Sequence, residues 1–105
     1  MHSTLEALLT PNSSHSLRRN YRSLDGQHDF TFRFVPCSSH IEVYCLAHPS
    51  LNGQDDAVSK THLYSSGRLC FVQGKEPRTH WRAEELAAQW AEYFLEYRRT
   101  GITQE

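Results

Sequence analysis

A cysteine and a histidine flank a tight turn in the last third of the chain, and this pair is the best candidate for thiol chemistry. The turn is Ser65-Ser66-Gly67, in which Gly67 is free to take a positive φ. Residues 68–72 then run extended, so Cys70 lies just past the turn, and His62 can fold back toward it. The thiolate is the reactive form of cysteine and needs a neighbour to stabilise it. The alternative is a small buried cysteine in a strand beside a surface histidine.

Two segments that alternate between apolar and polar residues precede this turn and predict antiparallel strands. Their apolar residues are Phe30, Phe32 and Phe34 in the first segment, and Ile41, Val43, Cys45 and Ala47 in the second. Pro36 ends the first segment, and the connection to the second is short enough for an antiparallel pair. Residues 18–22 fit either an earlier edge strand or the end of a helix.

Residues 83–99 predict an amphipathic helix, because apolar residues recur there at spacings of three and four. The residues on this apolar face are Leu86, Ala87, Trp90, Ala91, Phe94 and Tyr97. Gly101 is well placed to leave the helix in a left-handed conformation, and both Trp81 and Trp90 are expected in the core. Strands followed by a packed helix indicate an α+β fold, an antiparallel β-meander with a packed C-terminal helix.

The first 27 residues are polar and are expected to form a short N-terminal helix and a linker, ahead of a folded domain over 28–105. Ser3 and Glu6 fit a capping box for that helix, and Pro11 stops it. The alternative is that residues 1–16 are a disordered tail.

Composition excludes several classes of function. The 105 residues carry 11 Lys and Arg against 12 Asp and Glu, and a net charge of -1 attracts no phosphate backbone, so we expect no nucleic-acid partner. The apolar runs are far shorter than the roughly 18 to 20 residues of a membrane span, and no secretory signal is visible. Three irregularly spaced cysteines then indicate a reduced, cytoplasmic protein. The sequence contains no glycine-rich phosphate-binding loop, and we expect no cofactor.

The segment His62-x-Tyr64-x-x-Gly67-x-Leu69-Cys70-Phe71 resembles the active-site segment of the ubiquitin-conjugating enzyme superfamily. In its eukaryotic branch the segment reads H-P-N-I-Y-x-x-G-x-I-C-L, and His62 falls on the Asn. The bacterial branch is more similar, with a histidine at this position, then a Trp and a helix rich in Trp and Tyr that ends near Thr-Gly. The matching residues of this continuation are Trp81, Trp90, Tyr93, Tyr97, Thr100 and Gly101. The resemblance covers residues 28–104.

The resemblance implies a ubiquitin-conjugating-enzyme-like fold and a cysteine-dependent conjugating enzyme, or thioester carrier, for a ubiquitin-like modifier. Cys70 would accept the C-terminal carboxyl group of the modifier as a thioester from an adenylating activating enzyme. An amine would then attack, and His62 would donate to the oxyanion or take the amine proton. The alternative function is a non-catalytic module of the same fold that binds a ubiquitin-like or activating protein.

Four further residues are expected to support this site. Asp55 and Asp56 would orient or deprotonate the amine, although a solvated loop is the alternative interpretation of these acids. Tyr64 is expected to pack the loop, and Gly67 to permit its turn.

A second constellation, Cys37-x-x-His40 and Cys45-x-x-His48, has the ligand types of a tetrahedral zinc site. Residues three apart in a strand point to opposite faces, so the side chains of Cys45 and His48 should diverge. We therefore expect no metal, and a plain structural or zinc-stabilised domain is the third alternative.

Overall fold

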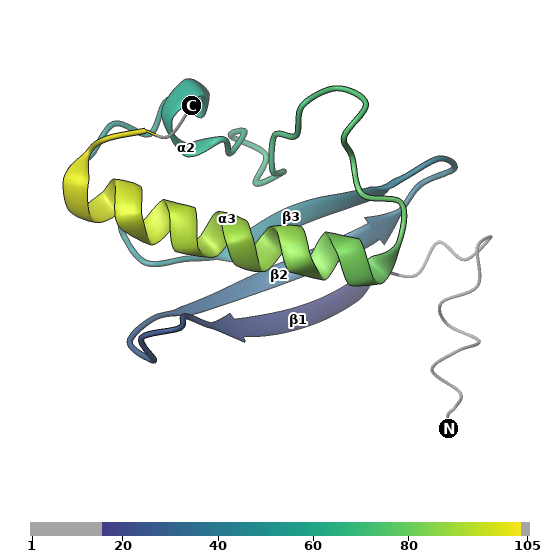
Figure 1. Ribbon diagram of the computed structural model, residues 1–105, viewed down its shortest axis with the longest axis horizontal. Coiled ribbons are helices and arrows are strands. Elements are labelled where there is room, and N and C mark those ends of the chain that lie inside the picture. The colour runs from purple at the N-terminus through teal and green to yellow at the C-terminus, as the bar shows by residue number, and fades with distance from the viewer. Residues whose placement is uncertain (1–15, 104–105) are drawn as a thin grey trace.

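The computed structural model describes residues 16–103, which form a three-stranded antiparallel sheet with a long helix lying across one face (Figure 1). The strands β1 (Leu17–Arg22), β2 (Asp29–Pro36) and β3 (Ile41–Ala47) are neighbours in chain order, as in a meander. The helices are α2 (Val58–Thr61) and α3 (His80–Thr100). This arrangement confirms the α+β class, the meander and the packed C-terminal helix.

The strand β1 lies within residues 1–27, for which the sequence predicts a short helix and a linker. It pairs along its whole length with β2, so the sheet begins before residue 28, and residues 18–22 form an edge strand. At one end of this pair, the Arg22 guanidinium binds both carboxylate oxygens of Asp29, at 3.0 and 3.1 Å. The predicted capping box of Ser3 and Glu6 lies outside the described residues.

The core lies between the sheet and α3. The sheet contributes Phe30, Phe32, Phe34, Ile41, Val43 and Cys45, and α3 contributes Ala83, Ala87, Trp90, Ala91, Phe94 and Tyr97. The Phe30 ring is fully buried and meets the rings of Trp90 and Phe94 edge-on, with centroids 6.0 and 5.9 Å away. The three phenylalanines share one buried face, as their alternation predicts.

Ala47 was expected on the buried face and is exposed instead. The register shifts between Thr31 and Phe32, because Phe32 pairs with Cys45 whereas Thr31 pairs with Ala47. Leu46 is therefore an extra residue in β3, and such a bulge reverses the alternation of side chains beyond it. The side chain of Ala47 therefore lies on the same outward face of the sheet as the side chain of Thr31.

Two apolar residues of α3 are less buried than expected. Leu86 is half-buried, and the small side chains of Ala83 and Ala87 form the sheet-facing surface instead. The expectation of a core position is wrong for Trp81, which is 73% exposed, and correct for Trp90. Trp81 lies in the first turn of the helix, two residues before Ala83, and this spacing places it on the opposite face.

The ends of α3 are capped by ordinary helix chemistry. The Thr79 hydroxyl accepts a hydrogen bond from the Arg82 amide at 3.1 Å, which explains why the helix begins before residue 83. At the other end, Gly101 has a φ of 74° and donates its N–H to the Tyr97 carbonyl, as predicted. Within residues 16–103, neither helix combines the length and the apolar character that crossing a bilayer requires.

Three aromatic side chains of α3 anchor the chain around α2. The indole N–H of Trp90 donates to the Thr61 carbonyl at 2.8 Å, and the Tyr97 hydroxyl donates to the Asp55 carbonyl at 2.7 Å. Between them, the Tyr93 hydroxyl donates to the Lys60 carbonyl. The segment that leads into the candidate site is thereby held against the long helix.

Candidate functional site

Residues 62–70 fold into a tight hairpin. Its arms are joined by hydrogen bonds from the Cys70 amide to the His62 carbonyl, 2.8 Å, and from the Tyr64 amide to the Arg68 carbonyl, 2.9 Å. The Gly67 amide donates to the Tyr64 carbonyl and closes the turn, also at 2.9 Å. The backbone therefore places His62 and Cys70 opposite each other.

The hairpin is attached to the free edge of β3. The Cys45 amide donates to the Gly67 carbonyl at 2.7 Å, and the Leu69 amide donates to the Val43 carbonyl at 2.8 Å. Gly67 has a φ of +92°, and a Cβ atom there would lie 3.1 Å from the Cys45 carbonyl oxygen. Both the turn and its contact with the sheet therefore require glycine.

Replacing Gly67 with alanine should lower the free energy of unfolding by about 1 to 3 kcal/mol, because alanine is strained at this φ and its Cβ crowds Cys45. Gly74→Ala is the matched control, since Gly74 has a φ of +86° but no atom within 4 Å of the added Cβ. Urea unfolding measures both losses. Equal losses would show that the close approach to β3 contributes nothing.

The Cys70 side chain is half-buried, and its neighbour is the Tyr64 hydroxyl. The hydrogen bond to Cys70 is the main cause that raises the pKa of Tyr64, so this hydroxyl remains a donor at neutral pH. The Arg68 guanidinium lies 4.8 Å from the centre of the Tyr64 ring and holds that ring by a cation–π contact. Beyond the packing role expected of it, Tyr64 therefore offers a hydrogen-bond donor beside the thiol.

His62 ends α2 in a left-handed conformation, with a φ of 56° and its amide bonded to the Val58 carbonyl. Its imidazole ring packs on Tyr93 of α3, with centroids 5.2 Å apart. The backbone thus joins His62 to Cys70, while the imidazole rests on the helix. A left-handed residue other than glycine is strained, and such residues cluster at functional sites.

The two acidic residues lie in the loop before α2. The Asp55 carboxylate accepts a hydrogen bond from the Ala57 amide at 3.0 Å and so shapes the start of that helix. Asp56 lines an open cleft of about 860 Å³ between β3, α2 and the turn of the hairpin. Among the described residues that line this cleft, neither Cys70 nor His62 is found. Cys70 and His62, the pair expected to be catalytic, are therefore not part of the cleft that Asp56 lines.

Mild alkylation near pH 8 should label Cys70 well before Cys45. Cys45 is 7% exposed, and burial raises the pKa of its thiol from 9.0 to about 12, which lowers its thiolate fraction about 10³-fold. Cys37 should also react more slowly than Cys70. Peptide mass mapping of the labelled protein checks this order, and preferential labelling of Cys37 or Cys45 would contradict it.

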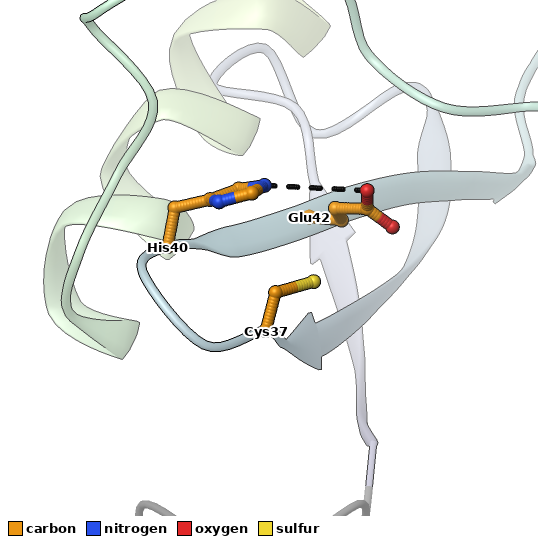
Figure 2. A group of neighbouring side chains, drawn as sticks. All are labelled: Cys37, His40 and Glu42. Atoms are coloured by element: carbon orange, nitrogen blue, oxygen red, sulfur yellow. Dashed lines mark ion pairs between the residues drawn. The ribbon is translucent and has the colours of Figure 1, made fainter.

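The four residues of the array Cys37, His40, Cys45 and His48 do not lie together in the structure. Cys45 lies in the core, and His48 follows the bulge, with its ring 4.8 Å from that of Phe94. Cys37 and His40 instead lie together with Glu42, which is not part of the Cys/His array (Figure 2). His40 lies immediately before β3, and Glu42 is the second residue of that strand. Residues two apart in an extended segment share a face, and this spacing is the signal that could have found Glu42.

No family model, curated protein or solved structure matches this chain. The fold and the site define a small α+β protein with a half-buried cysteine at the end of a hairpin that extends the sheet.

Proposed function

We propose that the protein is a cysteine-dependent conjugating enzyme, or thioester carrier, for a ubiquitin-like modifier. The observation that carries the proposal is the placement of Cys70, whose half-buried thiol follows a tight turn and neighbours the Tyr64 hydroxyl. The order of elements supports it, since a meander precedes this hairpin and a helix rich in Trp and Tyr follows it.

The proposed reaction has two steps. The Cys70 thiolate attacks the thioester carbon that the activating enzyme presents, and the cysteine of that enzyme leaves as a thiolate. An amine then attacks the acyl group on Cys70, its proton passes to His62 or to solvent, and Cys70 leaves as a thiolate when the amide forms. The intermediate carries an oxyanion, which a donor beside the thioester stabilises. His62 and the Tyr64 hydroxyl are the two donors that we propose.

The proposed partners are the C-terminal segment of a ubiquitin-like protein and an adenylating activating enzyme. Activation consumes ATP, and the thiols must stay reduced, so we propose that the reaction takes place in the cytoplasm. Neither nucleic acid nor a membrane is needed for it.

The proposal is tested with a synthetic peptide that ends in glycine as an alkyl thioester, which replaces the unidentified activating enzyme and modifier. The wild type should gain one acyl group that maps to Cys70 and is removed by excess thiol. Cys70→Ser should form a slower, thiol-resistant ester, and Cys70→Ala should gain no acyl group at this site. Cys37→Ala is the matched control and should react like the wild type. Equal acylation of Cys37 and Cys70 in the wild type would contradict the proposal.

A non-catalytic binding module of the same fold is the second candidate, and one observation favours it. The cleft of about 860 Å³ lies beside the hairpin turn but is not lined by Cys70. A binding module would hold its ubiquitin-like partner with unchanged affinity after Cys70→Ala. A conjugating enzyme would lose the covalent adduct in the same variant.

A further inference from the structure

We propose that Cys37, His40 and Glu42 form a zinc site on the hairpin that joins β2 and β3. One ligand atom from each residue, the Cys37 sulfur, an imidazole nitrogen and a carboxylate oxygen, lies within 4.8 Å of the other two. Figure 2 shows the three side chains extending to the same side of this hairpin. The proposal does not depend on the proposed function.

The backbone of the hairpin places these ligands. The Cys37 amide donates to the His40 carbonyl at 2.7 Å, so the two residues face each other across the Ser38-Ser39 turn. Residues opposite each other in an antiparallel pair project their side chains to one face. Glu42 lies two residues further along and shares that face, whereas Ile41 between them is buried in the core.

Neighbouring groups orient two of the ligands. The Ser39 hydroxyl and the His40 Nδ1 are hydrogen-bonded at 3.1 Å, which leaves Nε2 directed at the Glu42 carboxylate, 4.0 Å away. The Tyr44 hydroxyl donates to the other carboxylate oxygen of Glu42 at 2.8 Å. Metal-binding histidines and carboxylates are usually fixed by partners of this kind.

The ligand types select the metal. A thiolate, an imidazole and a carboxylate suit Zn²⁺, whereas Mg²⁺ and Ca²⁺ prefer oxygen ligands alone. Zinc bonds of about 2.0 to 2.3 Å in a tetrahedron bring ligand atoms to roughly 3.5 Å from one another, so the side chains must close by about 1 Å.

The charges and the space around the site are compatible with a divalent cation. The Arg68 guanidinium lies 3.5 Å from Glu42, but a Cys37 thiolate and the Glu42 carboxylate together offset it and part of the metal charge. His40 and Glu42 also line a pocket of about 220 Å³, which leaves room for water as the fourth ligand.

Binding exchanges one bond for another without any redox step. The zinc–sulfur bond replaces the S–H bond of Cys37, and the released proton passes to solvent. Affinity should therefore fall as the pH is lowered, because protons compete with the metal for the thiolate.

The experiment uses the full chain, reduced and freed of metal with a chelator, and titrates it with Co²⁺ as a coloured substitute for Zn²⁺. We expect one ion per chain, a thiolate-to-cobalt charge-transfer band and displacement by Zn²⁺. Cys37→Ser and His40→Ala should each weaken binding by at least about 100-fold, and Glu42→Gln by about 10-fold or more. His48→Ala and Cys70→Ser are the matched controls and should bind like the wild type.

Alkylation of the wild type gives a second readout that needs no variant to fold. Zn²⁺ should protect Cys37 from the reagent and leave Cys70 as reactive as before. The absence of a charge-transfer band, or unprotected Cys37 at saturating Zn²⁺, would overturn the proposal. So would loss of binding in His48→Ala but not in Glu42→Gln, because the ligands would then be those of the Cys/His array.

Discussion

His62→Ala should still accept an acyl group at Cys70 but should pass it to an amine on the order of 10²- to 10³-fold more slowly than the wild type. Aminolysis loses both the donor to its tetrahedral oxyanion and the imidazole that can take the amine proton. Loading starts from a thiolate and has no amine proton to remove, so it should be slowed less. The measurement is a single-turnover reaction of the purified peptide adduct with excess lysine, followed by intact mass.

Two further variants separate catalysis from backbone strain. His62 has a φ of 56°, which alanine tolerates poorly, whereas asparagine accepts this conformation and also donates a hydrogen bond. His62→Asn should therefore recover much of the rate. If His62→Ala discharges at the wild-type rate, His62 serves only to end α2. Tyr64→Phe then shows whether the hydroxyl beside Cys70 is the donor instead.

Phe30→Ala should lower the free energy of unfolding by about 3 to 5 kcal/mol, the usual loss when a large aromatic core residue is truncated. Phe30 is fully buried, and its ring contacts Phe32 as well as Trp90 and Phe94, so one deletion removes packing between the sheet and α3. The total free energy of unfolding of a native domain is about 5 to 15 kcal/mol. Urea unfolding should therefore show a large fall in the midpoint.

Val72→Ala is the control for this measurement, because Val72 is 73% exposed and its loss should change stability by less than about 0.5 kcal/mol. A Phe30→Ala loss no larger than that of Val72→Ala would contradict the packing of α3 on β2.

Local patterns of apolar residues predicted most of the fold, because each pattern indicates that one face of a strand or helix is buried. The alternation at Phe30, Phe32 and Phe34 requires a strand with one buried side, and the three-and-four spacing up to Phe94 requires a helix. Two features escaped this reasoning because they depend on pairing between segments. The polar strand β1 has few buried residues of its own, and the bulge at Leu46, which exposes Ala47, becomes visible only in the register with β2.

The candidate site was predictable as far as the turn that brings Cys70 opposite His62. The pairing of the Tyr64 hydroxyl with Cys70 was not, because it depends on how the side chain of Tyr64 is turned and held by Arg68. Glu42 is not part of the Cys/His array. That array includes Cys45 instead, which the alternation of the same strand buries in the core.

A helix of four residues does not persist alone in water, so α2 depends on the hydrogen bonds from Trp90, Tyr93 and Tyr97 to the carbonyl groups around it. We therefore expect α2 and α3 to open and close together, as one cooperative unit in amide hydrogen exchange. His62 caps α2 and is the first residue of the hairpin. Loosening α3 at Trp90 would consequently disturb the surroundings of Cys70 without altering a single residue of the hairpin.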